Sequence, residues 1–225
     1  MKSLTSWFVL LVSIAVIVSS CAKSDESTSS PTSSPTSSSD DTSDNSTTTS
    51  DNSTNTSDNS SSQSVPGVFV ALAESGNIVR STDNGSSWDN VTSPTSNHLY
   101  GVTFGNNTFV GVGASGNIVR STDNGSSWDN VTSPTGNSLR GVTFGNNTFV
   151  GLGSGNFVRS TDNGSSWDNA TSPTTNHLKG VTFGNNTFVA VGDGGTIVKS
   201  TNNGSSFDNV TSPTANHLYG VTFSE

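Results

Sequence analysis

Three histidines occupy the same place in a repeated sequence and are the first candidates for chemistry. His98, His177 and His217 each stand just before a short apolar segment, where the remaining repeat has Ser138. Imidazole nitrogens are suitable ligands for Zn²⁺ or Cu²⁺. Their spacing, however, is not that of a metal-binding motif, and side chains from separate repeats are expected to lie too far apart to share one ion. We therefore expect hydrogen-bonded loop histidines, with no metal site and no cofactor.

The carboxylates of the repeated region are candidates for acid–base chemistry. An ordinary glycosidase needs an asymmetric pair of carboxyl groups, one acting as acid and the other as base or nucleophile. Glu74 and Asp193, both in expected loops, are the candidates for such a pair. The repeats place nearly the same residue at every equivalent position, whereas catalysis needs different residue types that converge on one substrate. The prediction is therefore a protein that is not an enzyme, with a degenerate glycosidase as the least favoured alternative.

The positions at which the repeats differ are better candidates for a binding surface. The residue before the first glycine of the opening strand is Tyr, Arg, Lys and Tyr in successive repeats. Aromatic and cationic side chains are typical of recognition surfaces. The predicted binding residues are His98, Tyr100, Arg140, His177, Lys179, His217 and Tyr219. Tolerated surface variation is the alternative interpretation of the same differences.

Four similar stretches of about 40 residues must supply the elements that position these side chains. In the second stretch, residues 99–104, 108–112, 118–122 and 128–132 are expected to form strands, separated by turns rich in Asn and Gly. Asn and Gly tolerate the positive φ that tight hairpins need. Repeats of this length and composition predict an all-β protein, a small β-propeller with one sheet per repeat.

The phase of the repeat predicts how the sheets close. The repeated region opens at residues 68–72, which correspond to a second strand, and ends at residues 218–223, which correspond to a first strand. The C-terminal strand can complete the N-terminal sheet and so remove an exposed edge. We expect four blades of four antiparallel strands, closed by the C-terminal strand, as a monomer. A half-ring that dimerises into an eight-bladed propeller, or a truncated relative of a larger propeller, is the alternative.

A Ser-x-Asp-x-Gly-x-x-Trp pattern in each repeat resembles the Asp-box, or BNR repeat, of sialidase-like propellers. The first three copies match fully, whereas the fourth has Asn202 and Phe207 in place of Asp and Trp. The resemblance implies that the Asp caps backbone amides in a turn and that the aromatic residue packs between blades. These structural positions are Asp83, Gly85, Trp88, Asp123, Gly125, Trp128, Asp162, Gly164, Trp167, Gly204 and Phe207. Residues 116–128 also resemble photosystem II stability/assembly-factor-like propellers.

Sialidases of this family use three arginines that converge on the substrate, so the resemblance raises the question of such a cluster here. Arg80, Arg120 and Arg159 occupy the same strand position in successive repeats, and Lys199 occupies the fourth. We expect these side chains to point in equivalent directions rather than to converge.

The N-terminal region predicts a lipid-anchored protein of a bacterial envelope. Residues 1–20 have the basic start and apolar run of a signal peptide. Residues 18–21 resemble a lipobox, which implies cleavage before Cys21 and lipidation of this residue, the one cysteine in the chain. An ordinary signal peptide is the alternative. Residues 21–64 are rich in Ser, Thr, Asp and Asn and are expected to form a disordered linker, which leaves residues 65–225 for the propeller.

The net charge of −9 argues against a nucleic-acid partner, because phosphate binding needs a basic surface. The predicted function is non-catalytic: a protein-binding or assembly-scaffold propeller that the lipid anchor attaches to the membrane. An envelope protein is the expected partner. Binding of an envelope polysaccharide by a lectin-like surface is the alternative. The predicted location is the outer-membrane, periplasmic or cell-surface side of the envelope.

Overall fold

The computed structural model describes residues 67–225. The predictions for the signal peptide (residues 1–20), for Cys21 and for the linker (residues 21–64) lie outside these residues. Within the described part, fifteen strands and three short 3₁₀ turns follow one another along the chain. No helix in this part is long and apolar enough to cross a membrane.

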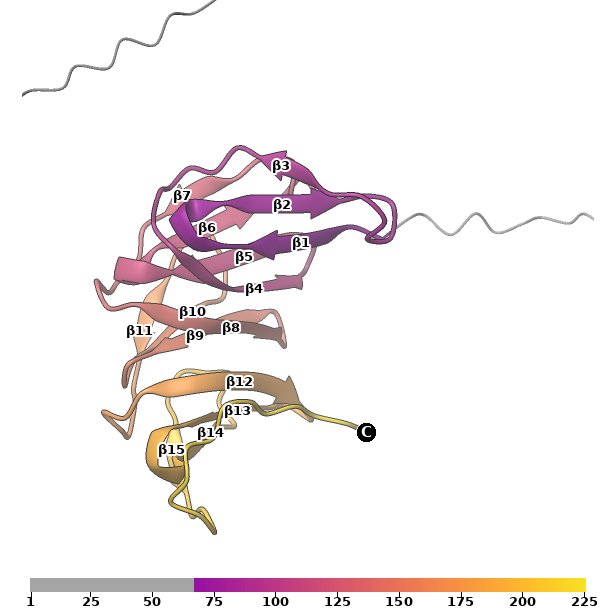
Figure 1. Cartoon of the computed structure of the whole chain (residues 1–225). Helices are drawn as coiled ribbons and strands as arrows, with labels where there is room; N and C mark the ends of the chain where they lie inside the picture. Colours follow the sequence, from indigo (N-terminus) through magenta and orange to yellow (C-terminus); the bar gives the residue numbers. More distant parts are fainter. Residues whose placement is uncertain (1–66) are drawn as a thin grey trace, which may run out of the picture. The chain divides into compact units, whose positions relative to one another are not determined.

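The strands form four antiparallel sheets, one from each repeat (Figure 1). The first sheet contains β1 (Phe69–Leu72), β2 (Ile78–Ser81) and β3 (Asp89–Val91). The second contains β4 (Leu99–Gly105), β5 (Thr108–Gly113), β6 (Ile118–Ser121) and β7 (Asp129–Val131). The third contains β8 (Leu139–Gly145), β9 (Thr148–Gly153), β10 (Phe157–Ser160) and β11 (Asp168–Ala170). The fourth contains β12 (Leu178–Gly184), β13 (Thr187–Gly192), β14 (Ile197–Ser200) and β15 (Asp208–Val210).

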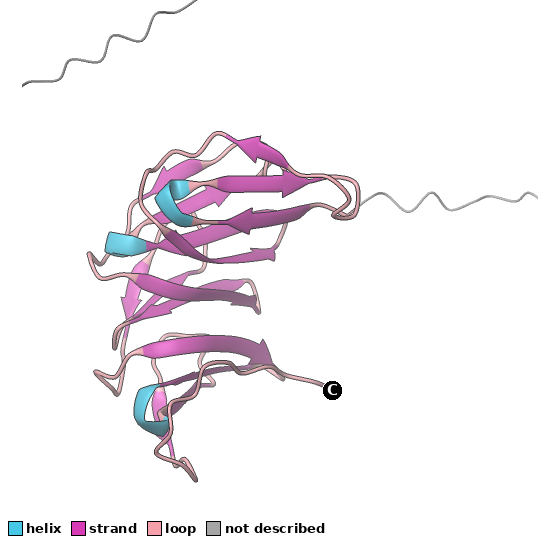
Figure 2. Cartoon of the chain, in the orientation of Figure 1, coloured by secondary structure: helices cyan, strands magenta, loops and turns pink. Residues whose placement is uncertain are grey.

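Local sequence explains the turns between the strands. Asn106 and Asn107, which join β4 to β5, have φ values of 48° and 56°. Two consecutive residues with positive φ form the tight turn that matches the twist of a hairpin, and Asn adopts this conformation more readily than most residues. The 3₁₀ turns η1 (Glu74–Gly76), η2 (Ala114–Gly116) and η3 (Asp193–Gly195) join β1 to β2, β5 to β6 and β13 to β14. Figure 2 shows these turns in cyan at one end of the sheets.

The hydrophobic core lies between neighbouring sheets. One cluster joins Val110, Val112 and Ile118 of the second sheet to Leu139, Phe149 and Val158 of the third, and Trp167 completes it. Equivalent clusters join the first sheet to the second and the third to the fourth. Each sheet is therefore stabilised mainly by the apolar surface that it buries against the next one.

Glycines at the ends of the first strands allow the sheets to approach closely. A Cβ atom at Gly105 would lie 2.1 Å from the ring of Phe144 on the first strand of the next sheet. Gly145 has the same relation to Phe183, so this Gly–Phe contact sets the spacing of successive sheets.

The C-terminal segment shows that the predicted closure of the ring is wrong. The first sheet has three strands, and residues 218–223 belong to no strand. This segment instead lies along β12, where Phe223 covers Gly184, and the Leu218 amide donates to the carbonyl of Gly192, the last residue of β13, at 3.0 Å (Figure 1). The Leu99 amide donates in the same way to the Ala73 carbonyl of the first blade, and Phe144 and Phe183 cover Gly105 and Gly145 as Phe223 covers Gly184. The segment therefore lies where a further first strand would lie. The prediction of four antiparallel sheets is confirmed, but the C-terminal strand does not complete the first one.

Candidate functional site

The loop before each first strand is hydrogen-bonded to the preceding sheet. In three of these loops, Nδ1 of a histidine contacts the turn that precedes β2, β10 or β14 in the sheet before it. In the remaining loop, the hydroxyl of Ser138 makes this contact with the turn that precedes β6. The contacting pairs are Ser75 with His98, Ser115 with Ser138, Ser154 with His177, and Gly194 with His217, at 2.8–3.3 Å. This is the hydrogen-bonded role expected of loop histidines. Within residues 67–225, no group of three or more His, Cys, Asp or Glu side chains is placed to hold a metal ion.

A pocket of about 520 Å³ opens beside these loops. It is lined by Tyr100, Arg140, His177, Lys179, Asp193 and Tyr219. The first strands lie side by side, so the residues that precede their glycines fall in one row. A Cβ at Gly101 would lie 3.2 Å from Cα of Gly141, and one at Gly180 would lie 3.0 Å from Cα of Gly220. The pocket is thus built from positions that neighbouring repeats place next to one another.

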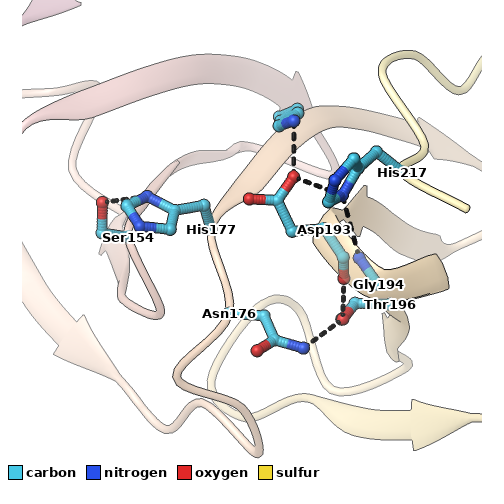
Figure 3. Close-up of polar contacts among 8 residues, drawn as sticks. Ser154, Asn176, His177, Asp193, Gly194, Thr196 and His217 are labelled. Atoms are coloured by element: carbon cyan, nitrogen blue, oxygen red, sulfur yellow. Dashed lines mark hydrogen bonds and ion pairs between the residues drawn. The ribbon is translucent and has the colours of Figure 1, made fainter. Parts of the chain in front are cut away.

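Asp193 is the negative charge of the pocket. Its carboxylate forms an ion pair with Lys179 and lies 2.9 Å from Nδ1 of His217. The hydrogen bond from Lys179 lowers the pKa of Asp193, and the charge of the same lysine adds to this effect. Figure 3 shows that the Thr196 hydroxyl donates to the Asp193 carbonyl, which fixes the turn that carries the carboxylate. Asp193 is therefore held in its ionised form.

Aromatic rings and cations alternate along the pocket. The Arg140 guanidinium lies 5.6 Å from the centre of the Tyr100 ring, and the Lys179 ammonium lies 4.3 Å from that of Tyr219. These distances are within the range of cation–π attraction. Within residues 67–225 no carboxylate pairs with Arg140, whereas Lys179 is paired with Asp193. One cation of the pocket is therefore available to a ligand.

Most of the predicted binding residues lie together. Tyr100, Arg140, His177, Lys179 and Tyr219 line the pocket. The other two flank it: the His98 ring is stacked on Tyr100 at 6.4 Å and the His217 ring lies 6.5 Å from Tyr219. Asp193 was not among the predicted binding residues, and its contacts with Lys179 and His217 were not foreseen. The signal was available, because the fourth repeat alone has Asp at the start of this turn.

The Asp-box turns join the last two strands of each sheet, such as β2 and β3 in the first. In the first, Oδ1 of Asp83 accepts hydrogen bonds from the Ser81 hydroxyl and the Ser87 amide at 2.7 and 2.9 Å. The Ser87 hydroxyl donates to Oδ2 at 2.6 Å, and the Trp88 indole donates to the Gly85 carbonyl at 3.2 Å. The hydrogen bonds from Ser87 and Ser81 lower the pKa of Asp83 to about 2. The carboxylate thus stabilises the turn as an acceptor of hydrogen bonds.

The fourth Asp-box has Asn202 in place of Asp and keeps the same hydrogen-bond partners. Oδ1 of Asn202 accepts from the Ser200 hydroxyl and the Ser206 amide, at 2.9 and 3.1 Å. Its amide group donates to the Ser206 hydroxyl at 2.8 Å. The turn therefore needs an acceptor oxygen at this position but no negative charge.

The strand arginines connect each sheet to the Asp-box turn of the next. Nε of Arg80 donates to the carbonyl of Asn124 at 2.6 Å. Arg120 and Asn163, and Arg159 and Asn203, form the same bond at 2.8 and 2.6 Å. As predicted, these side chains point in equivalent directions and form no three-arginine cluster.

Comparisons with known proteins identify the architecture. No family model matches the sequence, and no curated protein matches it. A structure of YCF48 bound to a D1 peptide is similar with a TM-score of 0.55 and 19% identity, over 69% of this chain and 54% of that one. An ancestral GH74 enzyme has a TM-score of 0.55 and 23% identity over 66% and 23% of the two chains. A nidogen/laminin complex has values of 0.56 and 14% over 70% and 66%.

The chain has a β-propeller fold. Its four sheets are blades, and each packs on the next through the interfaces described above. At these identities the similarity concerns the fold alone. The matched part of this chain spans about half the length of the YCF48 chain.

Proposed function

We propose that this propeller binds a protein partner, without catalysis, through the pocket lined by Tyr100, Arg140, Lys179 and Tyr219. The gathering of these residues in one pocket carries the proposal. At most other positions the four blades repeat the same residues. The pocket is formed by positions that differ between blades, so its combination of aromatic and charged side chains occurs once on the described surface. The comparison with YCF48, a protein of this fold bound to a D1 peptide, supports the same kind of partner.

The pocket suits a peptide segment with a carboxylate next to an apolar or aromatic side chain. Arg140 provides a guanidinium that no carboxylate of residues 67–225 neutralises, and guanidinium groups bind carboxylates through two parallel hydrogen bonds. Tyr100 and Tyr219 are exposed, so their rings are accessible to a partner. Tyrosine and arginine are the residue types that contribute most to many protein interfaces.

The state of Asp193 argues against a glycosidase. A general acid needs a raised pKa so that it carries a proton near neutral pH. The Lys179 hydrogen bond lowers the pKa of Asp193 and keeps it ionised. The strand arginines, which a sialidase would use to hold its substrate, instead donate to the turns of neighbouring blades.

We further propose that lipid on Cys21 attaches the propeller to the bacterial envelope and that residues 22–64 serve as the tether. The lipobox resemblance of residues 18–21 supports the anchor, and the low-complexity sequence supports the tether. The partner is then a protein of the envelope, within the reach of the tether.

Affinity capture tests the proposed function. The full chain, solubilised with its envelope, is compared with a variant that carries Tyr100→Ala, Arg140→Ala, Lys179→Ala and Tyr219→Ala. The matched control carries four alanines at exposed serines of the Asp-box turns: Ser86→Ala, Ser126→Ala, Ser165→Ala and Ser205→Ala. We expect one envelope protein to be captured by the native chain and the control and lost by the pocket variant. Equal capture by all three would refute the site.

Carbohydrate binding is the second candidate, because the Tyr219 ring is 70% exposed and an exposed ring provides a flat stacking surface. Competition by free envelope sugars distinguishes it. Loss of all captured material on addition of sugar would favour a lectin-like module over a protein-binding one.

A further inference from the structure

The first and the fourth blade each expose a surface that is buried between neighbouring blades elsewhere in the chain, and the two exposed surfaces are complementary. Inside the chain, three similar junctions join successive blades, and each contains a first strand, an Asp-box turn and a strand arginine that donates to this turn. Within residues 67–225, the first blade has no first strand, and residues 218–223 lie against the fourth blade in the position of a further first strand without forming one. We propose that a second copy of this chain forms the missing junction: residues 218–223 of each copy pair with β1 of the other and close a ring of eight blades.

Phe69 shows what is missing at the first blade. The equivalent residues Phe109, Phe149 and Phe188 are buried, each beneath a phenylalanine of the first strand of its own blade, with ring centres 4.6–4.7 Å apart. No phenylalanine of the described part of the chain covers Phe69 in this way, and Phe69 is 51% exposed. The burial of β1 alternates between exposed and partial, whereas β5 and β9 are buried throughout. Within residues 67–225, this sheet edge thus has neither a backbone partner nor a phenylalanine that covers it.

Phe223 is the residue that fits this place. It aligns with Phe104, Phe144 and Phe183, the phenylalanines that cover the second strands, and it is 44% exposed. In the second blade Val102 pairs with Gly111 and Phe104 with Phe109. The same register predicts that Val221 pairs with Ala71, and Phe223 with Phe69, of the other copy. Residues 218–223 already occupy the position of a fourth first strand, after β4, β8 and β12, so they need not leave β12 to make these pairs.

The Asp-box surfaces are complementary in the same way. A Cβ at Gly125 would lie 2.9 Å from Val70 of the preceding blade, whereas nothing lies within 4 Å of the same position at Gly85. Trp88 is 44% exposed, although Trp128 and Trp167 are buried at the same position. At the other end, Val189 and Ile197 are only partly covered and Lys199 is exposed. In the proposed junction Trp88 covers the two apolar residues, and Lys199 donates to the Asn84 carbonyl as the strand arginines do within the chain.

Two copies supply a partner for both ends. Ser224 stands where Gly105, Gly145 and Gly184 each face the next phenylalanine, so the Phe104 ring of the second copy must be displaced there. A junction between an N-terminal and a C-terminal end is head-to-tail, and such contacts form a closed ring only if the rotation between copies allows it. Closure removes the unpaired edge of β1, which would otherwise remain open to non-specific pairing.

The dimer also extends the pocket. Tyr100, Arg140, Lys179 and Tyr219 lie in a row along successive first strands. In the closed ring, Tyr219 is followed by Tyr100 of the second copy, so the row continues without a break and the binding site is completed by both copies. The second copy is needed for the junction whether or not the proposed partner is correct.

Sedimentation equilibrium of the full chain in mild detergent tests the proposal. Every sample carries Cys21→Ser, which removes the candidate lipidation site. We expect twice the chain mass of 23.1 kDa. Phe69→Lys and Phe223→Glu should each raise the dissociation constant at least about 100-fold, since each removes a buried aromatic contact from two junctions. Ser126→Lys, an exposed change away from the junction, should have no effect. Circular dichroism checks that each variant is folded.

Mixing the two variants provides a specific rescue. A pair made of one Phe69→Lys chain and one Phe223→Glu chain contains one native junction and one junction with a Lys–Glu pair, so we expect dimers to return. Dimerisation that is lost and not rescued, a native chain that remains monomeric, or a mass above two copies would overturn the closed two-copy ring.

A disulfide distinguishes closure between copies from closure within one chain. Ala71→Cys and Val221→Cys are introduced together in the Cys21→Ser chain. Directly opposed antiparallel residues have Cα atoms about 4.5–5.5 Å apart, within the range of disulfides. We expect oxidation to yield covalent dimers. An internal disulfide at monomer mass, or no disulfide, would contradict the proposed junction. Failure of the capture experiment would leave this result unchanged, so the two proposals are tested separately.

Discussion

Phe149 and Phe69 occupy the same repeat position in opposite environments, and replacing each by alanine gives the sharpest test of how the blades are stabilised. Phe149 is fully buried, with the Phe144 ring at 4.7 Å and the Trp167 ring at 6.4 Å. Phe69 is 51% exposed, and the Trp88 ring lies at 6.5 Å. The surrounding sequence motifs are nearly the same, so differences in intrinsic strand preference largely cancel.

The expected costs differ severalfold. Truncation of a buried phenylalanine removes its transfer free energy and leaves a cavity, for a total of about 3–5 kcal/mol. This is a large part of the stability of an ordinary domain, about 5–15 kcal/mol. Phe69 buries only about half of its surface in a single chain. Its loss should therefore cost about 1 kcal/mol, because burying a whole Phe side chain stabilises by about 1.5–3 kcal/mol.

Urea unfolding, followed by tryptophan fluorescence, measures both free energies. At a protein concentration below the dimer dissociation constant, Phe149→Ala should lower the midpoint far more than Phe69→Ala. Above that constant, the cost of Phe69→Ala should rise, since the junction buries this ring, while the cost of Phe149→Ala stays constant. Equal costs at low concentration would refute the claim that the core lies between the blades. A constant, small cost of Phe69→Ala would argue against the junction.

Two further predictions concern the turns and the glycines. The Asp-box carboxyls have pKa values of about 2 in the folded chain, below an unfolded value of about 3.9, so their contribution is present above pH 4 and is lost as the pH falls towards 2. Replacing all three by asparagine, as in the fourth repeat, should retain the turns and flatten this acid-side loss of stability in urea titrations between pH 2 and 6; an unchanged pH profile would contradict this assignment. A Cβ at Gly113 would lie 2.1 Å from the His98 carbonyl oxygen, so Gly113→Ala should cost about 1–3 kcal/mol. Gly136→Ala, with nothing within 4 Å of its Cβ position, should leave the thermal midpoint unchanged or slightly raised; equal effects of the two would show that this contact imposes no constraint.

The local elements of the fold could be predicted from the sequence because their causes are local. The Asn–Asn turns and the alternating apolar residues specify each hairpin within a few residues. The closure could not be predicted, because residues 218–223 repeat the sequence of β4. Such a segment makes two contacts in a complete blade: one with the preceding sheet, and one with the second strand of its own sheet. The sequence contains both preferences, and only the structure shows that residues 218–223 make the first.

The residues of the candidate site could be predicted from the sequence, but the contacts between them could not. Tyr100, Arg140, Lys179 and Tyr219 stood out because a repeated framework makes its exceptions visible. The role of Asp193 was missed because it depends on two contacts that join different segments, to Lys179 at the start of β12 and to His217 before the C-terminal segment. Repetition identifies positions that vary, but it does not show which of the varying side chains meet.

The cations of residues 67–225 connect the two proposals. Six lysines and arginines occur there, and the strand arginines of the first three blades are each bound to the turn of the next blade. Lys179 is paired with Asp193, which leaves Arg140 and Lys199 without an anionic or carbonyl partner in this part of the chain. Arg140 lies in the pocket, and Lys199 lies at the unpaired end of the fourth blade. The side chains that the fold itself does not use are therefore those that each proposed interface requires: Arg140 for the carboxylate of a partner, and Lys199 for the Asn84 carbonyl of the second copy.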